Sequence, residues 1–195
     1  MFEIKVKVVL LGDSGVGKTT LAKSFLSGGD KLDVSLRSTI GADISIKKSE
    51  YHIEPLGRIL FKWVIFDLAG QHMFRIIHPL YYKGAKAAIL VYDVSRKETF
   101  HNLALWIDGF IGHVGEPKPM IIIGNKIDLR DKTPCIPSEA GEKYAEALAT
   151  ELGVPVYYAE TSAINGINVE ESFEALARLL VEYTRRKGLK ELGEK

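Results

Sequence analysis

One stretch near the start of the chain decides the fold: KVKVVLLGDSGVGKTTLAKSFL, residues 5–26. Its first part ends in the run VVLL, which is apolar on both faces, as expected for a central strand of a parallel sheet. A glycine-rich loop follows. Residues 18–26 then have helical character and stop before Gly28 and Gly29, a common signal for a helix C-terminus. The stretch therefore predicts a strand, a tight loop and a helix in direct succession.

The loop GDSGVGKT, residues 12–19, fits the pattern GxxxxGK[ST]. Its glycines let successive backbone N–H groups point at one phosphate group, and the helix adds the positive end of its dipole. We expect Lys18 to bridge the β- and γ-phosphates of a nucleotide and the Thr19 hydroxyl to bind Mg²⁺. The alternative is a plain glycine-rich turn, but a chance match to the pattern has a frequency of about 1% in such a chain. The predicted phosphate-binding residues of this segment are Asp13, Ser14, Gly15, Val16, Gly17, Lys18, Thr19 and Thr20.

Apolar runs alternate with segments of helical periodicity over the rest of the chain. Two β-rich segments, 42–48 and 58–67, flank the turn-forming residues 54–57 and predict a hairpin. Further on, the sequence predicts buried strands at 87–93, 120–125 and 154–160 and helices near 97–113, 138–152 and 168–187. This order predicts an α/β fold with an open, mostly parallel sheet, to which the hairpin adds one antiparallel edge strand.

The segment DLAGQ, residues 67–71, follows the second strand of the hairpin. The pattern DxxG occurs by chance in about half of chains this long, so its weight comes from its position. Ligands of such sheets bind at the carboxyl ends of the strands. We expect Asp67 to reach Mg²⁺ through water, Gly70 to offer its N–H to a γ-phosphate, and Gln71 to act as the catalytic residue that orients the attacking water. An exposed loop glutamine is the alternative for Gln71.

The segment NKID, residues 125–128, follows another predicted strand. The Asp128 carboxylate can accept hydrogen bonds from the N1–H and 2-amino groups of guanine. Adenine lacks this pair of donors, and a carboxylate left unpaired against it would cost about 1–3 kcal/mol. We expect Lys126 to lie along the ring, and a backbone N–H after the last strand to reach guanine O6. The predicted guanine-binding residues are Asn125, Lys126, Asp128, Ser162 and Ala163.

Composition excludes several classes of protein. The chain has 195 residues, enough for one well-buried core, and 26 Lys and Arg against 25 Asp and Glu give a formal charge of +1. This balance argues against a nucleic-acid-binding protein. One cysteine, Cys135, excludes an internal disulfide and any CxxC site, and a reducing setting is expected. The sequence contains no apolar run near the roughly 18 residues of a membrane helix.

Several stretches resemble the Ras superfamily of small GTPases, and most of all its Rab branch. They are GDSGVGKT (12–19), STIG (38–41), DLAGQ (67–71), YYKGAKAAILVYDV (81–94) and NKID (125–128). The resemblance covers about residues 2–186. It implies a P-loop fold, that is, a Ras-like G domain with six strands and helices on both faces of the sheet. It also implies binding of GTP and GDP with Mg²⁺, and a metal site formed by Thr19, Thr39 and Asp67. Thr39 matches the switch I threonine that joins the metal and the γ-phosphate only in the GTP state. Residues near 70–82 match switch II.

The resemblance further implies a slow GTPase that acts as a molecular switch, in membrane traffic or a related signalling role. We expect a monomer with a GTPase domain over residues 1–187 and a short polar tail over 188–195. Expected partners are effectors, exchange factors and GTPase-activating proteins. Residues 183–195 contain no cysteine, so the expectation is a cytoplasmic protein with no stable lipid anchor on this chain, which reaches membranes through partners. The alternative is that the natural protein has a longer tail than this sequence.

Two departures from the family pattern affect the base pocket. No phenylalanine or tyrosine lies between Leu26 and Tyr51, so the aromatic ring that shields guanine in the family is missing. Leu32 or Val34 would have to replace it, or the base is more open. Ile164 stands where the family's SAK signature has lysine, which removes one side-chain contact near the base.

Some residues allow two interpretations. Ile44, Phe66 and Tyr81 match the apolar triad that effectors of Rab proteins contact, but ordinary packing between the hairpin and switch II is the alternative. Arg37 on switch I is a candidate for an arginine that neutralises transition-state charge in cis, or else a solvated loop residue.

Two other functions compete with the GTPase. A P-loop ATPase or nucleoside kinase would recognise adenine or a phosphoryl acceptor, and Asp128 with Gln71 argues against it. A nucleotide-binding module without turnover would not need Gln71 or Thr39. The sequence therefore favours the GTPase.

Overall fold

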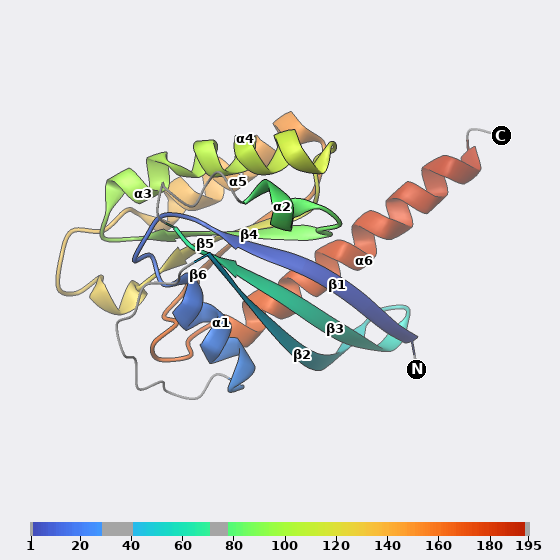
Figure 1. Cartoon of the computed structure of the whole chain (residues 1–195), viewed down its shortest axis with the longest axis horizontal. Coiled ribbons are helices and arrows are strands. Elements are labelled where there is room, and N and C mark those ends of the chain that lie inside the picture. The colour runs from blue at the N-terminus through green and yellow to red at the C-terminus, as the bar shows by residue number, and fades with distance from the viewer. Residues whose placement is uncertain (1, 29–40, 71–77, 194–195) are drawn as a thin grey trace.

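A computed structural model describes residues 2–28, 41–70 and 78–193. These residues form one six-stranded sheet with the strand order β2-β3-β1-β4-β5-β6 (Figure 1). The strands are β1 (Phe2–Leu11), β2 (Ala42–Ile53), β3 (Gly57–Leu68), β4 (Ala87–Asp93), β5 (Met120–Asn125) and β6 (Val156–Thr161). Only the pairing of β2 with β3 is antiparallel, and β2 lies at the edge. The predicted fold class is confirmed.

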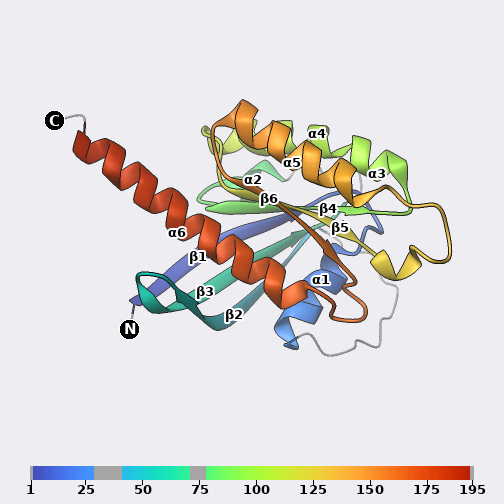
Figure 2. The same ribbon diagram turned by 180° about the vertical axis from the view of Figure 1, so that it is seen from behind.

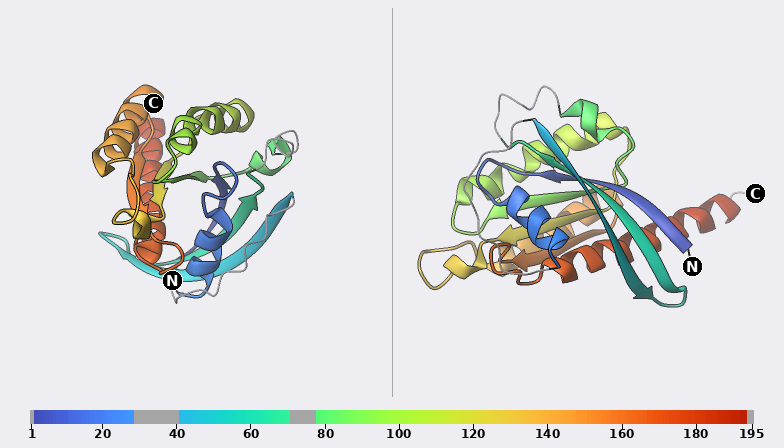
Figure 3. Two further views of the ribbon diagram at one scale, coloured as in Figure 1. Left: turned by 90° about the vertical axis from the view of Figure 1, so that its left-hand side faces the viewer. Right: turned by 60° about the horizontal axis from the view of Figure 1, so that its bottom comes forward.

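Helices cover both faces of the sheet (Figures 1 and 2). They are α1 (Lys18–Leu26), α2 (Pro79–Tyr82), α3 (Lys97–His101), α4 (Leu103–Val114), the 3₁₀ turn η2 (Ile127–Leu129), α5 (Ser138–Leu152) and α6 (Val169–Gly193). Helices α1 and α6 pack on one face, and α2, α4 and α5 pack on the other. The C-terminal end of α6 extends beyond the rest of the molecule (Figure 3). Within the described residues no helix is long and apolar enough to cross a membrane.

The central strands are buried on both sides, which explains their unbroken apolar sequences. All seven residues of β4 and all six of β5 are buried. A strand covered by helices on both faces has no solvent side, so its residues do not alternate. The run VVLL of β1 is buried in the same way, with each residue 0% exposed. The loops of the candidate site follow the ends of these buried strands.

The structure differs from the predicted elements in several places. Strand β2 continues to Ile53, past the alternating segment 42–48, because it pairs with β3 as far as the turn. The helix predicted near 97–113 is divided at Asn102 into α3 and α4. Helix α6 runs to Gly193, past the predicted helix end near residue 187.

Candidate nucleotide site

Four loops meet at one end of the sheet, where the carboxyl ends of β1, β3, β5 and β6 lie, because these strands run parallel. They are residues 12–17 after β1, 69–70 after β3, 126–128 after β5 and 162–163 after β6. These are the segments in which the sequence placed phosphate, metal and guanine recognition. The structure brings them together.

The loop after β1 needs glycine at two positions. Gly12 has φ 137°, and a Cβ there would lie 2.1 Å from the carbonyl oxygen of Val91. Gly17 has φ 102°, and a Cβ there would lie 2.3 Å from Nδ2 of Asn125. Both backbone conformations are strained for residues with a side chain. The loop therefore follows a tight path against β4 and β5 that only this glycine pattern permits.

Lys18 lies inside this loop with 6% of its surface exposed. Its Nζ donates hydrogen bonds to the carbonyl oxygens of Gly12 (2.8 Å) and Asp13 (2.9 Å). Burial lowers the pKa of Lys18 to about 8, the carboxylates of Asp67 and Asp13 oppose this shift, and Arg96 adds to it. The ammonium group is thus held at the inner side of the loop, where the pattern predicted a phosphate contact.

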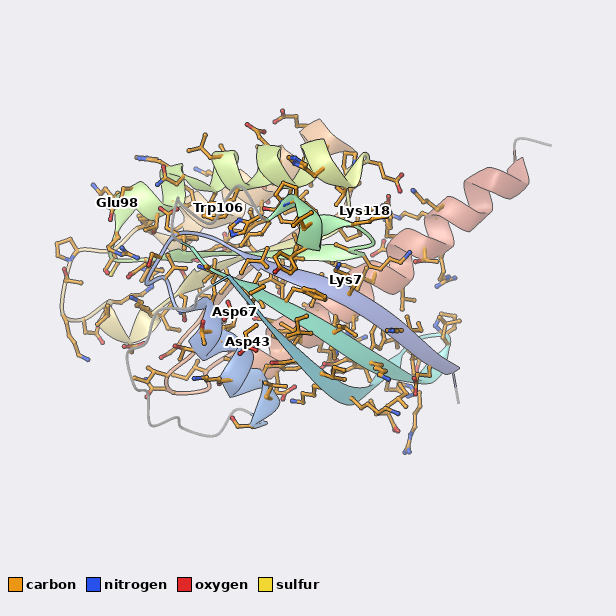
Figure 4. The ribbon with its side chains drawn as sticks, in the orientation of Figure 1. Lys7, Asp43, Asp67, Glu98, Trp106 and Lys118 are labelled. Carbon is orange, nitrogen blue, oxygen red and sulfur yellow. The ribbon has the colours of Figure 1, made fainter. Side chains whose placement is uncertain are left out.

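Thr19 and Asp67 are joined at the start of α1. The Thr19 hydroxyl donates a hydrogen bond to Oδ2 of Asp67. Asp67, labelled in Figure 4, comes from the end of β3, and its side chain is buried. A hydroxyl and a carboxylate are the hard oxygen donors that Mg²⁺ prefers, together with phosphate oxygens and water. The pair therefore fits the predicted metal site. The third predicted ligand, Thr39, lies outside the described residues.

Gly70 contacts the phosphate loop directly. A Cβ at this position would lie 2.4 Å from the carbonyl carbon of Asp13 and 2.5 Å from Nζ of Lys18. The segment after β3 therefore reaches the same point as the lysine. Gln71 and Arg37 lie outside the described residues, so their assigned roles remain predictions.

Asp13 is held by α4, which the sequence did not indicate. Its Oδ1 accepts a hydrogen bond from Nε1 of Trp106 (2.9 Å), and its Oδ2 accepts one from Nδ2 of Asn102 (2.7 Å). Both oxygens of its carboxylate thus accept hydrogen bonds from the protein, and its role in phosphate binding stays a prediction. Neither Asn102 nor Trp106 carries a motif signal.

Asn125 links three of the loops. Its Nδ2 donates to the carbonyl oxygen of Val16 (2.8 Å), and its Oδ1 accepts from Oγ1 of Thr161 and from the N–H of Ala163, each at 3.0 Å. The Ala163 N–H, expected to reach guanine O6, thus donates to Asn125 in this structure. Asn125 positions its neighbours, and its own polar atoms are used within the protein.

Asp128 and Ser162 are in contact although they come from separate loops. The Ser162 hydroxyl donates to Oδ1 of Asp128 and accepts a hydrogen bond from Nδ2 of Asn165 (3.1 Å). This hydrogen bond orients the carboxylate that the sequence assigned to guanine. Two predicted guanine-binding residues are therefore neighbours in space.

Lys126 pairs with an aspartate that the sequence analysis did not identify. Its Nζ lies 2.7 Å from Oδ2 of Asp93, the last residue of β4. Burial works against ionisation of Asp93, but hydrogen bonds from Lys126 and Ser95 outweigh it and hold its pKa below the ordinary value. Asp93 could have been found from its position, because it ends a central strand at the same edge as Asp67.

The comparisons with known proteins agree with this arrangement. The model of the Ras family matches residues 7–182. The chain is 38% identical over 174 residues to Ras-related protein Rab-31 of Rattus norvegicus, a match that covers 89% of this chain and 82% of the relative. It is 39% identical over 177 residues to Ras-related protein SEC4 of Saccharomyces cerevisiae, covering 91% and 75%. It is 38% identical over 178 residues to the Ypt/Rab-type GTPase YPT7 of the same yeast, covering 89% and 80%. Because these matches cover most of the chain and the fold agrees with them, the chain belongs to the Ras family and, within it, to the Rab-type small GTPases.

Proposed function

We propose that this GTPase is a regulatory switch of membrane traffic that binds GDP and GTP together with Mg²⁺. One observation carries the proposal: the polar groups of Lys18, Thr19, Asp67 and Asp128 gather at one edge of the sheet, from loops far apart in the sequence. The placement in membrane traffic is what membership of the Rab branch implies.

The phosphates would lie in the loop of residues 12–17, with Lys18 turned from the carbonyl oxygens that it now contacts to phosphate oxygens. Thr19 and Asp67 would hold Mg²⁺, joined by Thr39 in the GTP state. The metal, when bound, neutralises charge that develops on the phosphates. Gln71 would orient a water whose oxygen forms a bond to the γ-phosphorus, while the bond from phosphorus to the β,γ-bridging oxygen breaks and releases phosphate and GDP.

Guanine would be recognised by Asp128, which accepts from N1–H and the 2-amino group, with Ser162 holding the carboxylate in place. Lys126 would lie along the ring with its stem. Asn125 would contribute by fixing the loops, since both ends of its amide are bonded to the protein. The base pocket is thus built from two loops that support each other.

The switch would act through Gly70 and the segments that follow the site. Gly70 touches the loop of residues 12–17, so loss of the γ-phosphate would change the contacts at the start of switch II. Ile44 is paired with Phe66 across the hairpin and is 54% exposed, and the Phe66 ring lies 6.1 Å from that of Tyr81. This apolar patch beside switch II is a suitable contact surface for effectors.

The test is turnover of GTP by the purified protein. We expect γ-phosphate release from GTP and none from ATP. Gln71→Leu removes the water-orienting amide, so GTP binding persists while single-turnover hydrolysis falls about ten-fold or more. Hydrolysis of GTP by Gln71→Leu at the original rate would contradict the role of Gln71, and equal use of ATP would contradict the proposed function.

A further inference from the structure

A second cation lies against the phosphate loop, from a segment that none of the sequence motifs includes. Arg96 belongs to the turn between β4 and α3. Its Nη2 donates a hydrogen bond to the carbonyl oxygen of Ser14 (3.0 Å), and a Cβ built on Gly15 would lie 3.7 Å from the same nitrogen. The guanidinium group therefore touches the middle of the loop that is proposed to bind phosphate.

Asp93 holds this guanidinium in place. Oδ2 of Asp93 accepts from Nε of Arg96 (3.1 Å) and pairs with Nζ of Lys126 (2.7 Å). Oδ1 of Asp93 is occupied by the backbone N–H (2.9 Å) and the hydroxyl (2.6 Å) of Ser95. The carboxylate is 3% exposed, so it is a fixed anchor rather than a mobile surface group. Arg96 is thus positioned before any nucleotide binds.

The guanidinium group of Arg96 still has N–H donors that can bind an anion. A guanidinium has five N–H donors, and in the described part of the chain its hydrogen bonds to Ser14 and Asp93 use two of them. The Arg96 side chain is 37% exposed, which leaves it accessible at the mouth of the site. Lys18 is the other cation of this loop, with its Nζ on the carbonyl oxygens of Gly12 and Asp13. Two cations that repel each other across a loop are stabilised when an anion binds there.

We propose that Arg96 is a nucleotide-binding residue, the second cation of the phosphate site, which stabilises the bound polyphosphate together with Lys18. This inference rests on the proposed function. Asp93 fixes Arg96 independently of the switch segments, so its charge acts equally on GDP and on GTP before reaction. An interaction present to the same extent in ground and transition states changes affinity and leaves the rate of the chemical step unchanged.

The experiment compares Arg96→Gln and Arg96→Lys with a matched control, Lys97→Gln. Lys97 is the exposed neighbour of Arg96, and its replacement changes the net charge by the same amount. Affinities for GDP and GMP are measured by displacement of a fluorescent guanine nucleotide at low and high salt, with the melting temperature of each variant recorded.

We expect Arg96→Gln to weaken GDP about ten-fold, as for loss of a charge-assisted contact, and GMP about two-fold or less. Arg96→Lys keeps the charge and should recover most of the loss, and Lys97→Gln should bind GDP like the unmodified protein. The effect on GDP should shrink at high salt. Single-turnover hydrolysis at saturating GTP should be the same in Lys97→Gln as in the unmodified protein.

If Arg96→Gln loses equal affinity for GDP and for GMP, and Arg96→Lys does not restore it, the proposal is overturned. Arg96 would then only support the structure of the loop. Unchanged GDP affinity in Arg96→Gln would also overturn it. If Arg96→Gln does not fold, Arg96→Lys decides, since a charge contact predicts near-normal GDP affinity and a brace predicts weak binding. Failure of the unmodified protein to bind any guanine nucleotide would instead contradict the proposed function.

Discussion

At the scale of single residues, close backbone contacts decide what the site tolerates. Gly12, Gly17 and Gly70 each lie so near another part of the chain that a Cβ would approach it to within 2.5 Å. Only at Gly70 does the contact join a switch segment to the phosphate loop. We therefore expect Gly70 to transmit the gain or loss of the γ-phosphate to switch II, whereas Gly12 and Gly17 shape the loop itself.

We predict that Gly70→Ala impairs the switch without abolishing binding. The added methyl group would meet the Asp13 backbone and Lys18 Nζ, and such overpacking costs about 1–3 kcal/mol. The start of switch II should then be held away from the loop, so GTP hydrolysis should fall about ten-fold or more while GDP affinity changes little. Single-turnover hydrolysis and GDP displacement measure the two effects.

Gly109→Ala is the matched control, because Gly109 lies in α4 with no heavy atom within 4 Å of an added Cβ. It should leave hydrolysis unchanged and stabilise the helix by about 0.5–1 kcal/mol. Normal hydrolysis in Gly70→Ala would mean that the close contact has no part in turnover.

At the scale of elements, α4 holds the phosphate loop from outside. Asn102 stands between α3 and α4, and its side chain reaches Asp13 together with that of Trp106. The sequence predicted one continuous helix here, because its apolar period is not interrupted at this position. At this break Asn102 donates a hydrogen bond to a residue 89 positions away, and no local pattern contains that information.

We predict that Asn102→Ala destabilises the protein by about 1–3 kcal/mol, because it removes a hydrogen bond from a partly buried carboxylate. Chemical denaturation of the GDP-bound form measures this change. Leu105→Ala serves as the control, since Leu105 is 55% exposed on the same helix and should change stability by less than about 0.5 kcal/mol. Equal stability of Asn102→Ala and the unmodified protein would show that α4 does not support the loop through this contact.

At the scale of the whole molecule, an aromatic cluster joins α1 and α6 to the sheet. The ring of Phe25 in α1 stacks on that of Phe173 in α6 at 3.5 Å between centroids, and Trp63 of β3 meets Phe173 edge-on at 5.6 Å. All three side chains are 0% exposed. The helix that begins at the phosphate loop and the helix that follows the guanine loop are thus fixed to each other through the core.

We predict that Phe173→Ala costs about 3–5 kcal/mol of stability, as for other buried aromatic residues truncated to alanine. Thermal and chemical unfolding measure the loss. Tyr157→Ala removes an aromatic side chain that is 47% exposed and should cost far less. Similar losses in the two variants would contradict the central position of this cluster.

Much of this architecture could be predicted from sequence, for a physical reason. Strands β4 and β5 and helices α1 and α5 begin and end where predicted, because fully buried runs and glycine stops are local signals. The positions of Asp93, Arg96 and Trp106 around the phosphate loop could not be predicted. Each depends on the direction of a side chain across strands or helices that are distant in the sequence.

The most direct test of the account is the nucleotide preference of Asp128→Asn. If Asp128 accepts from N1–H and the 2-amino group of guanine, the unmodified protein binds GDP and rejects xanthosine diphosphate, whose 2-oxo group would face the carboxylate. Asp128→Asn should weaken GDP by about 1.5–3 kcal/mol and let xanthosine diphosphate compete. Competitive displacement of a fluorescent guanine nucleotide measures both. Unchanged preference for GDP in Asp128→Asn would contradict the assignment of the base pocket to residues 125–128 and 162–163.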